Sequence, residues 1–343
     1  MEDYQYIYDL LDPQPDITSI NVKKIRRLCA VGLSECPPEV RCITWLVLLK
    51  VYPHNPHDWE TTKAQILKLY QLFICEYGLD NWHNTLIESN PKKESFPVQE
   101  QSIMSIIHGD ILRTGRLFYF LPPEEIPPNA NPDSIMSPFI YHIRRLERIL
   151  YIFSSTNPVL KYMQGFNELL IPLYYVAIMA KQLFNNDIDV LEAITFQMFL
   201  NLLTTTDLQE FYSVQDQSRA IINKMKVFDN LIKDLATESF VILETLSINP
   251  LLYAFRWFNL LFAQEHELPV LLIIWDAIFS HIEQLGEFSF YIGVAHVKNA
   301  HRSLDINSFP KTISALQNVM VSNIISLLKD ANQMWKSMHK CIA

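Results

Sequence analysis

The chain has 343 residues, of which 49% are hydrophobic, and it carries a formal net charge of −9. This length and composition predict one large or two medium globular domains with a sizeable core. Phosphate backbones require a clustered basic face, so the acidic balance argues against nucleic acid, and equally against an anionic membrane surface, as the main partner.

Cysteine usage and apolar stretches indicate a reducing, aqueous compartment. The five cysteines are an odd number and form no Cys-x-x-Cys pair, as in a chain that needs no disulfide. The first residues show no basic segment followed by an apolar one, so we expect no signal peptide. The longest apolar stretch, 169–180, is about 12 residues long and contains Pro172, short of the roughly 20 that span a bilayer. We expect a cytoplasmic protein without an integral membrane segment.

Apolar residues recur at helical spacing along most of the chain. The first clear pattern covers 66–77 and ends at Gly78, and the next runs from Ser137 to Asn157. Strand-like alternation is scarce, so we predict an all-α fold. Similar patterns predict helices over 188–204, 218–235, 250–264, 268–282 and 311–337.

Loops are marked by proline. The proline-rich stretches are 53–56, 90–97 and 122–132, and the last could be a surface insertion or could touch a partner. His54 and His57 have a spacing that a metal could use, but a solvated loop is the simpler interpretation of two histidines without further ligands.

Glycine is scarce, with only seven residues. The GxxxxGK and GxGxxG cradles, whose glycines let the backbone approach a phosphate, do not occur in the sequence. We therefore expect the chain to bind no ATP, GTP or NAD of its own and to need no cofactor.

Two short polar segments interrupt this apolar helical pattern: IHGDILRT at 107–114 and YMQG at 162–165. The first offers the guanidinium of Arg113 and the second the carboxamide of Gln164. A fixed cation stabilises the charge on a phosphoryl group in transfer, and an amide that donates and accepts can hold the attacking water in line. Alone, each has an ordinary alternative, because arginine often closes a helix and glutamine beside glycine often lies in a turn. Together they are what an outside helper of nucleoside triphosphate hydrolysis needs.

The same segments resemble the TBC domain, the family of GTPase-activating proteins for Rab GTPases. Residues 107–114 are similar to its IxxDxxRT motif and 162–165 to its YxQG motif. Two flanking segments agree in order and spacing. GLSECPPEVRCITW at 32–45 resembles the N-terminal GIP…R…W stretch, and FRWFNLLFAQEHELPVLLIIWD at 255–276 is similar to the late W…LF…LP…WD segment. The resemblance covers about residues 22–310.

The resemblance implies an all-α, V-shaped TBC domain of two helical lobes over residues 22–310. Residues 1–21 would then be an N-terminal extension. Residues 311–343 would form a C-terminal helix that completes the second lobe.

The resemblance also implies a site. Arg113 would be an arginine finger and Gln164 a glutamine finger, both supplied in trans to a GTP-loaded Rab, which brings the GTP and Mg²⁺. Asp110, three residues before Arg113 on a helical turn, can steer the guanidinium. The residues that would support the two fingers are Asp110, Thr114, Tyr162 and Gly165.

The sequence departs from the family pattern at three places. Gly115 and Arg116 follow the first motif where an apolar residue and proline are frequent. Lys161 precedes the second motif where glycine is frequent, and Ile273 stands where arginine is common. We expect the first two departures to alter loop geometry and partner choice.

The main prediction is an active Rab GTPase-activating protein, cytoplasmic and recruited peripherally to endomembranes by its Rab. One alternative is a catalytically weak Rab-binding adaptor of the same fold, which intact Arg113 and Gln164 argue against. Another is a helical scaffold unrelated to GTPases, in which both motifs would be coincidental.

Overall fold

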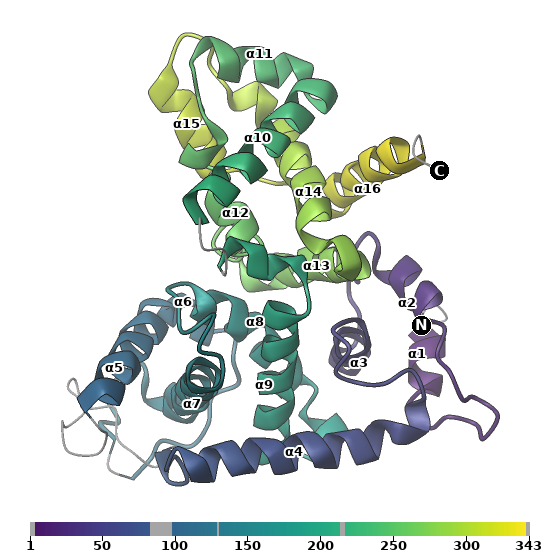
Figure 1. The fold of residues 1–343 in the computed structure, drawn as a ribbon, viewed down its shortest axis with the longest axis vertical. Helices are drawn as coiled ribbons and strands as arrows, with labels where there is room; N and C mark the ends of the chain where they lie inside the picture. Colours follow the sequence, from purple (N-terminus) through teal and green to yellow (C-terminus); the bar gives the residue numbers. More distant parts are fainter. Residues whose placement is uncertain (1–3, 83–97, 129, 213–216, 341–343) are drawn as a thin grey trace. The chain divides into compact units, whose positions relative to one another are not determined.

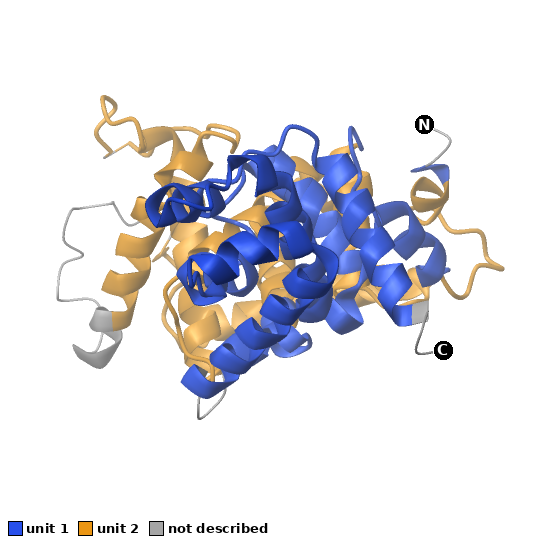
Figure 2. Ribbon diagram, turned by 90° about the horizontal axis from the view of Figure 1, so that it is seen from above, with its two compact units in different colours: residues 1–5, 21–36, 202–343 blue, residues 6–20, 37–201 orange. Residues whose placement is uncertain are grey.

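The structure, a computed structural model, describes residues 4–82, 98–128, 130–212 and 217–340, and all regular elements in these ranges are helices (Figure 1). The prediction of an all-α fold is confirmed. The predicted loop over 90–97 lies outside the described residues. The chain divides into two compact units, which are unit 1 (1–5, 21–36 and 202–343) and unit 2 (6–20 and 37–201) (Figure 2).

Unit 2 is built around α8 (Phe166–Met179), whose sequence FNELLIPLYYVAIM is almost wholly apolar and almost wholly buried. This helix contacts α3, α5 and α7. The other α-helices that belong wholly or mostly to unit 2 are α1 (Gln5–Asp9), α3 (Pro38–Leu48), α4 (Trp59–Glu76), α5 (Val98–Arg113), α6 (Gly115–Phe118), α7 (Ile140–Thr156) and α9 (Ile188–Thr204). Short 3-10 helices are η2 (Pro56–Asp58), η4 (Ser137–Phe139) and η5 (Lys181–Phe184).

Buried ion pairs hold α7 against its neighbours in unit 2. The carboxylate of Glu147, fully buried, meets the imidazole of His108 on α5 and accepts a hydrogen bond of 2.6 Å from Arg144. One turn after Arg144 on the same helix, Arg148 donates two hydrogen bonds of 2.6 and 2.7 Å to buried Glu192 on α9. Buried charges persist only when paired and hydrogen-bonded. The pairs therefore fix α5 and α9 relative to α7.

Unit 1 is built around α14 (Leu285–Ala300), which contacts α10, α13 and α16. A Cβ atom at Gly293 would lie 2.8 Å from the ring of Phe258 and 2.9 Å from that of Phe228, so only glycine allows this approach. The other α-helices of unit 1 are α2 (Val22–Cys29), α10 (Gln217–Leu235), α11 (Thr237–Thr245), α12 (Phe255–Asn259), α13 (Leu268–Ser280), α15 (Phe309–Gln317) and α16 (Ile324–Lys340). Its 3-10 helices are η6 (Asp207–Phe211), η7 (Pro250–Leu252), η8 (Ile282–Gln284) and η9 (His301–Ser303).

Most predicted helices are confirmed. The patterns over 188–204, 218–235 and 268–282 correspond to α9, α10 and α13 with η8, and the pattern from Ser137 corresponds to η4 and α7. The pattern over 66–77 is the second part of the longer α4, whose apolar face is mostly half-buried, with Tyr70 its one fully buried member.

The prediction of one helix over 250–264 is wrong. Only η7 and the short α12 form there, because Leu261 and Phe262 adopt left-handed backbone angles of +47° and +64°. Both side chains are fully buried, and the ring of Phe262 stacks on His296 with centroids 4.9 Å apart. Core packing here overrides the helical periodicity.

The prediction of one helix over 311–337 is also wrong. The segment 311–343 contains the end of α15 and all of α16, separated by residues 318–323. Asn318 ends α15 with a hydrogen bond from its backbone N–H to the carbonyl of Ser314. Asn323 begins α16 by accepting from the backbone N–H of Ser326 at 2.9 Å. The side chain of Asn318 also donates to the carbonyl of Ser314 at 3.0 Å. Each asparagine side chain thus makes a local hydrogen bond to the backbone, which favours a helix end at that place.

The proline-rich segment 122–132 runs along the surface and is fastened to α7. The backbone N–H of Glu124 donates to Pro138, and its carboxylate accepts from Arg145 at 2.8 Å. The buried imidazole of His142 donates through Nε2 to the carbonyl of Pro122, and burial lowers its pKa. The segment is therefore held in place at its first residues.

No single described helix is both long enough and apolar enough to cross a membrane. The bent pair 268–280 and 282–303, which turns by 87° at its break, meets the same criterion of length and composition only when its two parts are taken together. The described cysteines, at positions 29, 36, 42 and 75, are free thiols.

Candidate functional site

The arginine motif forms the last turn of α5. Asp110 is 2% exposed, whereas the side chain of Arg113 is 66% exposed. A carboxylate in the last turn opposes the helix dipole, while a guanidinium there is favoured by it. Capping of the helix therefore does not explain Asp110, and a buried carboxylate at this position needs hydrogen-bond donors from other residues.

The glutamine motif lies in the loop between α7 and α8. Two backbone positions in this loop are left-handed, Lys161 with φ of +47° and Gly165 with φ of +102°. The backbone N–H of Lys161 donates to the carbonyl of Asn157 at 2.8 Å, and Gly165 caps the start of α8. These turns leave Gln164 exposed, and its carboxamide makes no hydrogen bond with any described residue.

One carboxylate joins the two motifs. Oδ1 of Asp110 accepts a hydrogen bond from the guanidinium of Arg113, and Oδ2 accepts from the hydroxyl of Tyr162 at 2.7 Å. The ring of Tyr162 packs edge-on against Phe166, the first residue of α8, with centroids 6.1 Å apart. The buried carboxylate of Asp110 thereby connects the end of α5 to the loop before α8.

The state of Tyr162 is fixed by the same arrangement. Burial raises its pKa, and the hydrogen bond to the Asp110 carboxylate raises it further. The hydroxyl is therefore protonated at neutral pH and donates to Asp110.

A further contact, from the first motif to α8, was missed from the sequence. Asn167, 4% exposed on α8, donates from Nδ2 to the backbone carbonyl of Asp110 at 3.2 Å, and Thr114 Oγ1 donates to the carbonyl of Ile111 at 2.7 Å. Asn167 and Glu168 are polar residues in an otherwise apolar helix, directly after Gly165. That break in the apolar run was the signal that could have identified them.

Arg116, the extra cation after the first motif, is engaged elsewhere. Its guanidinium donates to both carboxylate oxygens of Glu168, at 3.0 and 3.4 Å. The Glu168 side chain is 5% exposed and that of Arg116 is 50% exposed. This forked pair is another link from the segment after α5 to α8.

Residues from the start of the first flanking motif and from the second meet at a turn within unit 1. Gly32 has φ of +86°, and a Cβ there would lie 2.3 Å from the side chain of Ile273. The backbone N–H of Leu33 donates to fully buried Asp276 at 2.9 Å. The side chain of Ile273 therefore packs directly against the turn at Gly32. Trp45, Trp257 and Trp275 are all buried core residues.

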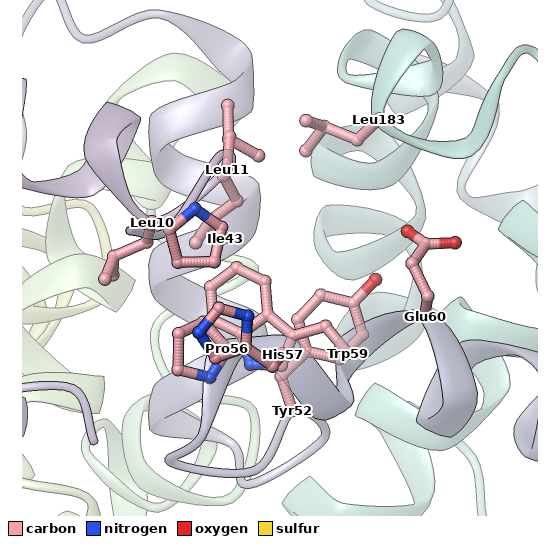
Figure 3. A pocket seen from close by; sticks show the side chains of 10 residues that line it. Leu10, Leu11, Ile43, Tyr52, Pro56, His57, Trp59, Glu60 and Leu183 are labelled. Carbon is pink, nitrogen blue, oxygen red and sulfur yellow. The ribbon is translucent and has the colours of Figure 1, made fainter. Parts of the chain in front are cut away.

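A hollow on unit 2 is lined by none of the predicted site residues. It has a volume of about 250 Å³ and lies beside Tyr52 and Trp59, whose rings stack with centroids 4.9 Å apart (Figure 3). Leu11 and Leu183 face it from the opposite side, and Glu60 points toward it. The carboxylate of Glu60 is paired with Lys63.

Metal-ligating side chains do not gather in the described ranges in groups of three or more. His57 lies in η2, where its backbone N–H donates to Asn55.

Comparison with known proteins identifies the family. The model of the Rab-GTPase-TBC domain matches residues 38–304. The chain belongs to this TBC family. It is 31% identical over 196 residues to TBC1 domain family member 13 of Mus musculus, covering 57% of this chain and 48% of that protein. It is 26% identical over 293 residues to TBC1 domain family member 22B of Homo sapiens, covering 82% and 52%. The chain spans about half the length of these curated relatives.

Solved TBC structures share the fold. The Ypt/Rab-GAP domain of Gyp1p aligns with a TM-score of 0.73 at 22% identity, covering 98% of this chain and 99% of that one. The Chlamydomonas flagellar RabGAP TBC domain aligns with a TM-score of 0.58 at 16% identity, covering 95% and 87%. These similarities confirm the all-helical TBC fold.

The left-handed backbone at position 161 explains why glycine is frequent there in the family pattern, from which this TBC domain departs. Lys161 has the backbone angle that glycine adopts without cost, and a side chain at such a position costs about 1–2 kcal/mol. The turn keeps its conformation with lysine because the surrounding hydrogen bonds hold it.

Proposed function

We propose that this TBC domain is a GTPase-activating protein that binds Rab GTPases in their GTP form and accelerates hydrolysis. The observation that carries the proposal is Asp110, whose single carboxylate accepts hydrogen bonds from both motifs. Around it, the guanidinium of Arg113 and the carboxamide of Gln164 are exposed, as groups that act on a partner's nucleotide must be.

The proposed chemistry divides between the two proteins. The Rab supplies GTP and Mg²⁺, and this chain needs no cofactor. Water attacks the γ-phosphorus as the bond to the β-phosphate oxygen breaks. Arg113 neutralises charge that develops on the phosphoryl oxygens, and Gln164 orients the water by donating to it or accepting from it.

Positioning residues complete the proposed site. Asp110 orients the guanidinium of Arg113, and Tyr162 holds Asp110. Gly165 gives the turn that exposes Gln164, and Thr114 closes the end of α5 through its hydrogen bond to Ile111. None of these groups transfers a proton in the proposed mechanism.

A Rab-binding adaptor with weak activity is the competing proposal. Binding alone can be served by any exposed cation, whereas stabilising a phosphoryl group in transfer requires a guanidinium held in one direction, as Asp110 holds that of Arg113. The arrangement at Asp110 therefore favours the activator. We further propose a cytoplasmic protein that reaches endomembranes through its Rab.

Single-turnover GTP hydrolysis by a panel of Rab GTPases tests the proposal. Arg113→Ala should remove a large part of the roughly 10³–10⁵-fold acceleration that such fingers supply, and Arg113→Lys should restore little, because an ammonium does not reproduce the planar fork. Gln164→Ala should also be severely impaired. The matched controls Arg302→Ala and Gln71→Ala change exposed residues far along the chain from both motifs and should keep the wild-type rate.

A Rab whose own switch glutamine is changed to leucine shows which protein supplies the glutamine that orients the water. It should still be hydrolysed in the presence of the wild-type chain, because Gln164 acts in its place. If the chain binds a Rab but accelerates GTP hydrolysis by none of the panel, the adaptor is supported. Acceleration that survives Gln164→Ala but disappears with the Rab glutamine would refute the two-finger mechanism.

A further inference from the structure

A basic hollow lies in unit 1 between α16 and the turn after α2. It has a volume of about 490 Å³. Asn332 on α16 donates from Nδ2 to the carbonyl of Ala30, which ties α16 to the end of α2, and both helices contact α13. The residues that line the hollow are Val31, Lys329, Asn332, Gln333, Lys336 and Ser337.

Two unpaired ammonium groups stand on one face of this hollow. Lys329 and Lys336 are exposed and seven residues apart on α16, so they share a helix face. Within the part of the chain that the structure describes, no ion pair is recorded for either. Asp330, exposed on the same helix, does not line the hollow.

The neighbouring helix α2 also carries cations, of which Arg26 is paired with Glu283 at 3.1 Å. Burial, together with the positive charges of Arg26 on α2 and Lys336 on α16, lowers the pKa of His281 to about 4. Lys23 and Arg27 are further exposed cations on α2. The net charge of −9 is a sum over the whole chain, and it does not describe the potential at one concave face.

Asn332, which lines the hollow, also carries an unsatisfied acceptor. Asn332 is 4% exposed, and its Oδ1 has no hydrogen-bond donor among the described residues. Buried acceptors without a donor are rare and indicate a missing partner. A hydroxyl group bound in the hollow would supply the donor once the Asn332 side chain turns toward it, which an unsubstituted anion such as sulfate would not.

We propose that this hollow binds a phosphorylated polyol, with the phosphate between Lys329 and Lys336 and a hydroxyl group donating to Asn332. Ammonium groups bind phosphate as compact point charges, and the amide of Gln333 offers a further donor. This headgroup chemistry exists both as a soluble inositol phosphate and on the surface of a membrane that contains phosphoinositides.

Binding by the full chain to both sources tests the proposal. The probes are phosphatidylcholine vesicles with a phosphatidylinositol phosphate, the same vesicles with phosphatidylserine instead, soluble inositol phosphate, and inorganic phosphate. Lys329→Ala with Lys336→Ala should weaken binding to the phosphoinositide vesicles roughly 30-fold, from about 1 kcal/mol per lysine. Lys68→Ala with Lys226→Ala removes the same charge from exposed helix positions elsewhere and should leave the affinity unchanged.

The outcomes separate the sources and the failures. Loss of both vesicle and inositol phosphate binding in the α16 variant supports the site for either source, and vesicle binding alone assigns it to a lipid headgroup. Three outcomes would overturn the proposal. The wild-type chain binds neither phosphoinositide vesicles nor inositol phosphate, or the control variant loses as much affinity as the α16 variant. In the third, phosphatidylserine vesicles bind as well as phosphoinositide vesicles, and inorganic phosphate as well as inositol phosphate. Unchanged thermal midpoints in both variants will show that the fold is intact, as expected for exposed lysines.

Discussion

Replacing Asp110 by asparagine isolates the charge of the carboxylate that joins the two motifs. The shape is kept, and both neighbours can still be satisfied. The amide oxygen can accept from Arg113, and the amide nitrogen can donate to the hydroxyl oxygen of Tyr162, because a hydroxyl both donates and accepts. What the variant loses is charge assistance in two hydrogen bonds.

The expected magnitudes follow from burial. A hydrogen bond to a charged group contributes about 1.5–3 kcal/mol, against about 1 kcal/mol for a neutral one. The side chain of Arg113 is 66% exposed, so solvent screening reduces its share. We expect the free energy of unfolding to fall by about 1–1.5 kcal/mol, and the stimulated rate to fall about tenfold as Arg113 loses its fixed orientation.

The assay measures stimulated hydrolysis and the thermal midpoint on the same preparation. An orienting carboxylate transfers no proton, so the pH profile of the stimulated rate should be unchanged between about 6 and 8 in Asp110→Asn. The matched variant Tyr162→Phe removes one hydrogen bond and keeps the carboxylate. It should cost about 1.5–3 kcal/mol of stability, because a buried carboxylate oxygen loses its donor, and lower the rate less than Asp110→Asn does.

Three results would refute this reasoning. A stimulated rate near that of the wild type would remove Asp110 from the site. A collapse of both rate and thermal midpoint would show that its role is structural. A shifted pH profile would mean that Asp110 takes part in proton transfer.

Further changes test the surrounding structure. Arg116→Ala removes the guanidinium that pairs with the buried carboxylate of Glu168 and should lower the free energy of unfolding by about 1–3 kcal/mol, measured by urea titration, and a smaller loss would mean that solvent screens the pair. Lys161→Gly should leave stability equal to the wild type or raise it by up to about 1 kcal/mol, because φ of +47° suits glycine, whereas Lys161→Ala should bring no gain. Burial lowers the pKa of His266 to about 4 and of His296 to about 3, while unfolded histidine titrates near 6.5. The unfolded chain then binds more protons below about pH 6.5, so this stability is fully present above that pH and falls by about 1.4 kcal/mol per histidine per unit as the pH drops toward 4. Urea unfolding at several pH values should show a shallower decline in His296→Asn.

Long helices could be predicted because their faces are buried in regular order. In α7, for example, Ile143, Leu146 and Ile149 are all fully buried, as their spacing requires. The segment around Leu261 and Phe262 could not be predicted in this way. It has helical spacing and apolar residues, but its backbone is set by contacts with α14, which is distant in the sequence.

The candidate site shows the same division. The residues of both motifs could be named from the sequence, and the structure brings Asp110, Arg113 and Tyr162 together. The pairing of Arg116 with Glu168, 52 residues away, depends on how α8 packs against α5 and α6. No local pattern encodes that packing, so the extra cation could be noticed but its partner could not.

The hydrogen bond from Arg113 to Asp110 has a thermodynamic consequence for an encounter with a GTPase. A long, exposed side chain that becomes fixed on association normally gives up rotamer freedom, at about 0.5–1.5 kcal/mol. Here part of that entropy is already lost in the unbound protein, because the guanidinium is hydrogen-bonded to the buried carboxylate of Asp110. An encounter therefore begins with the guanidinium confined to a narrow range of directions.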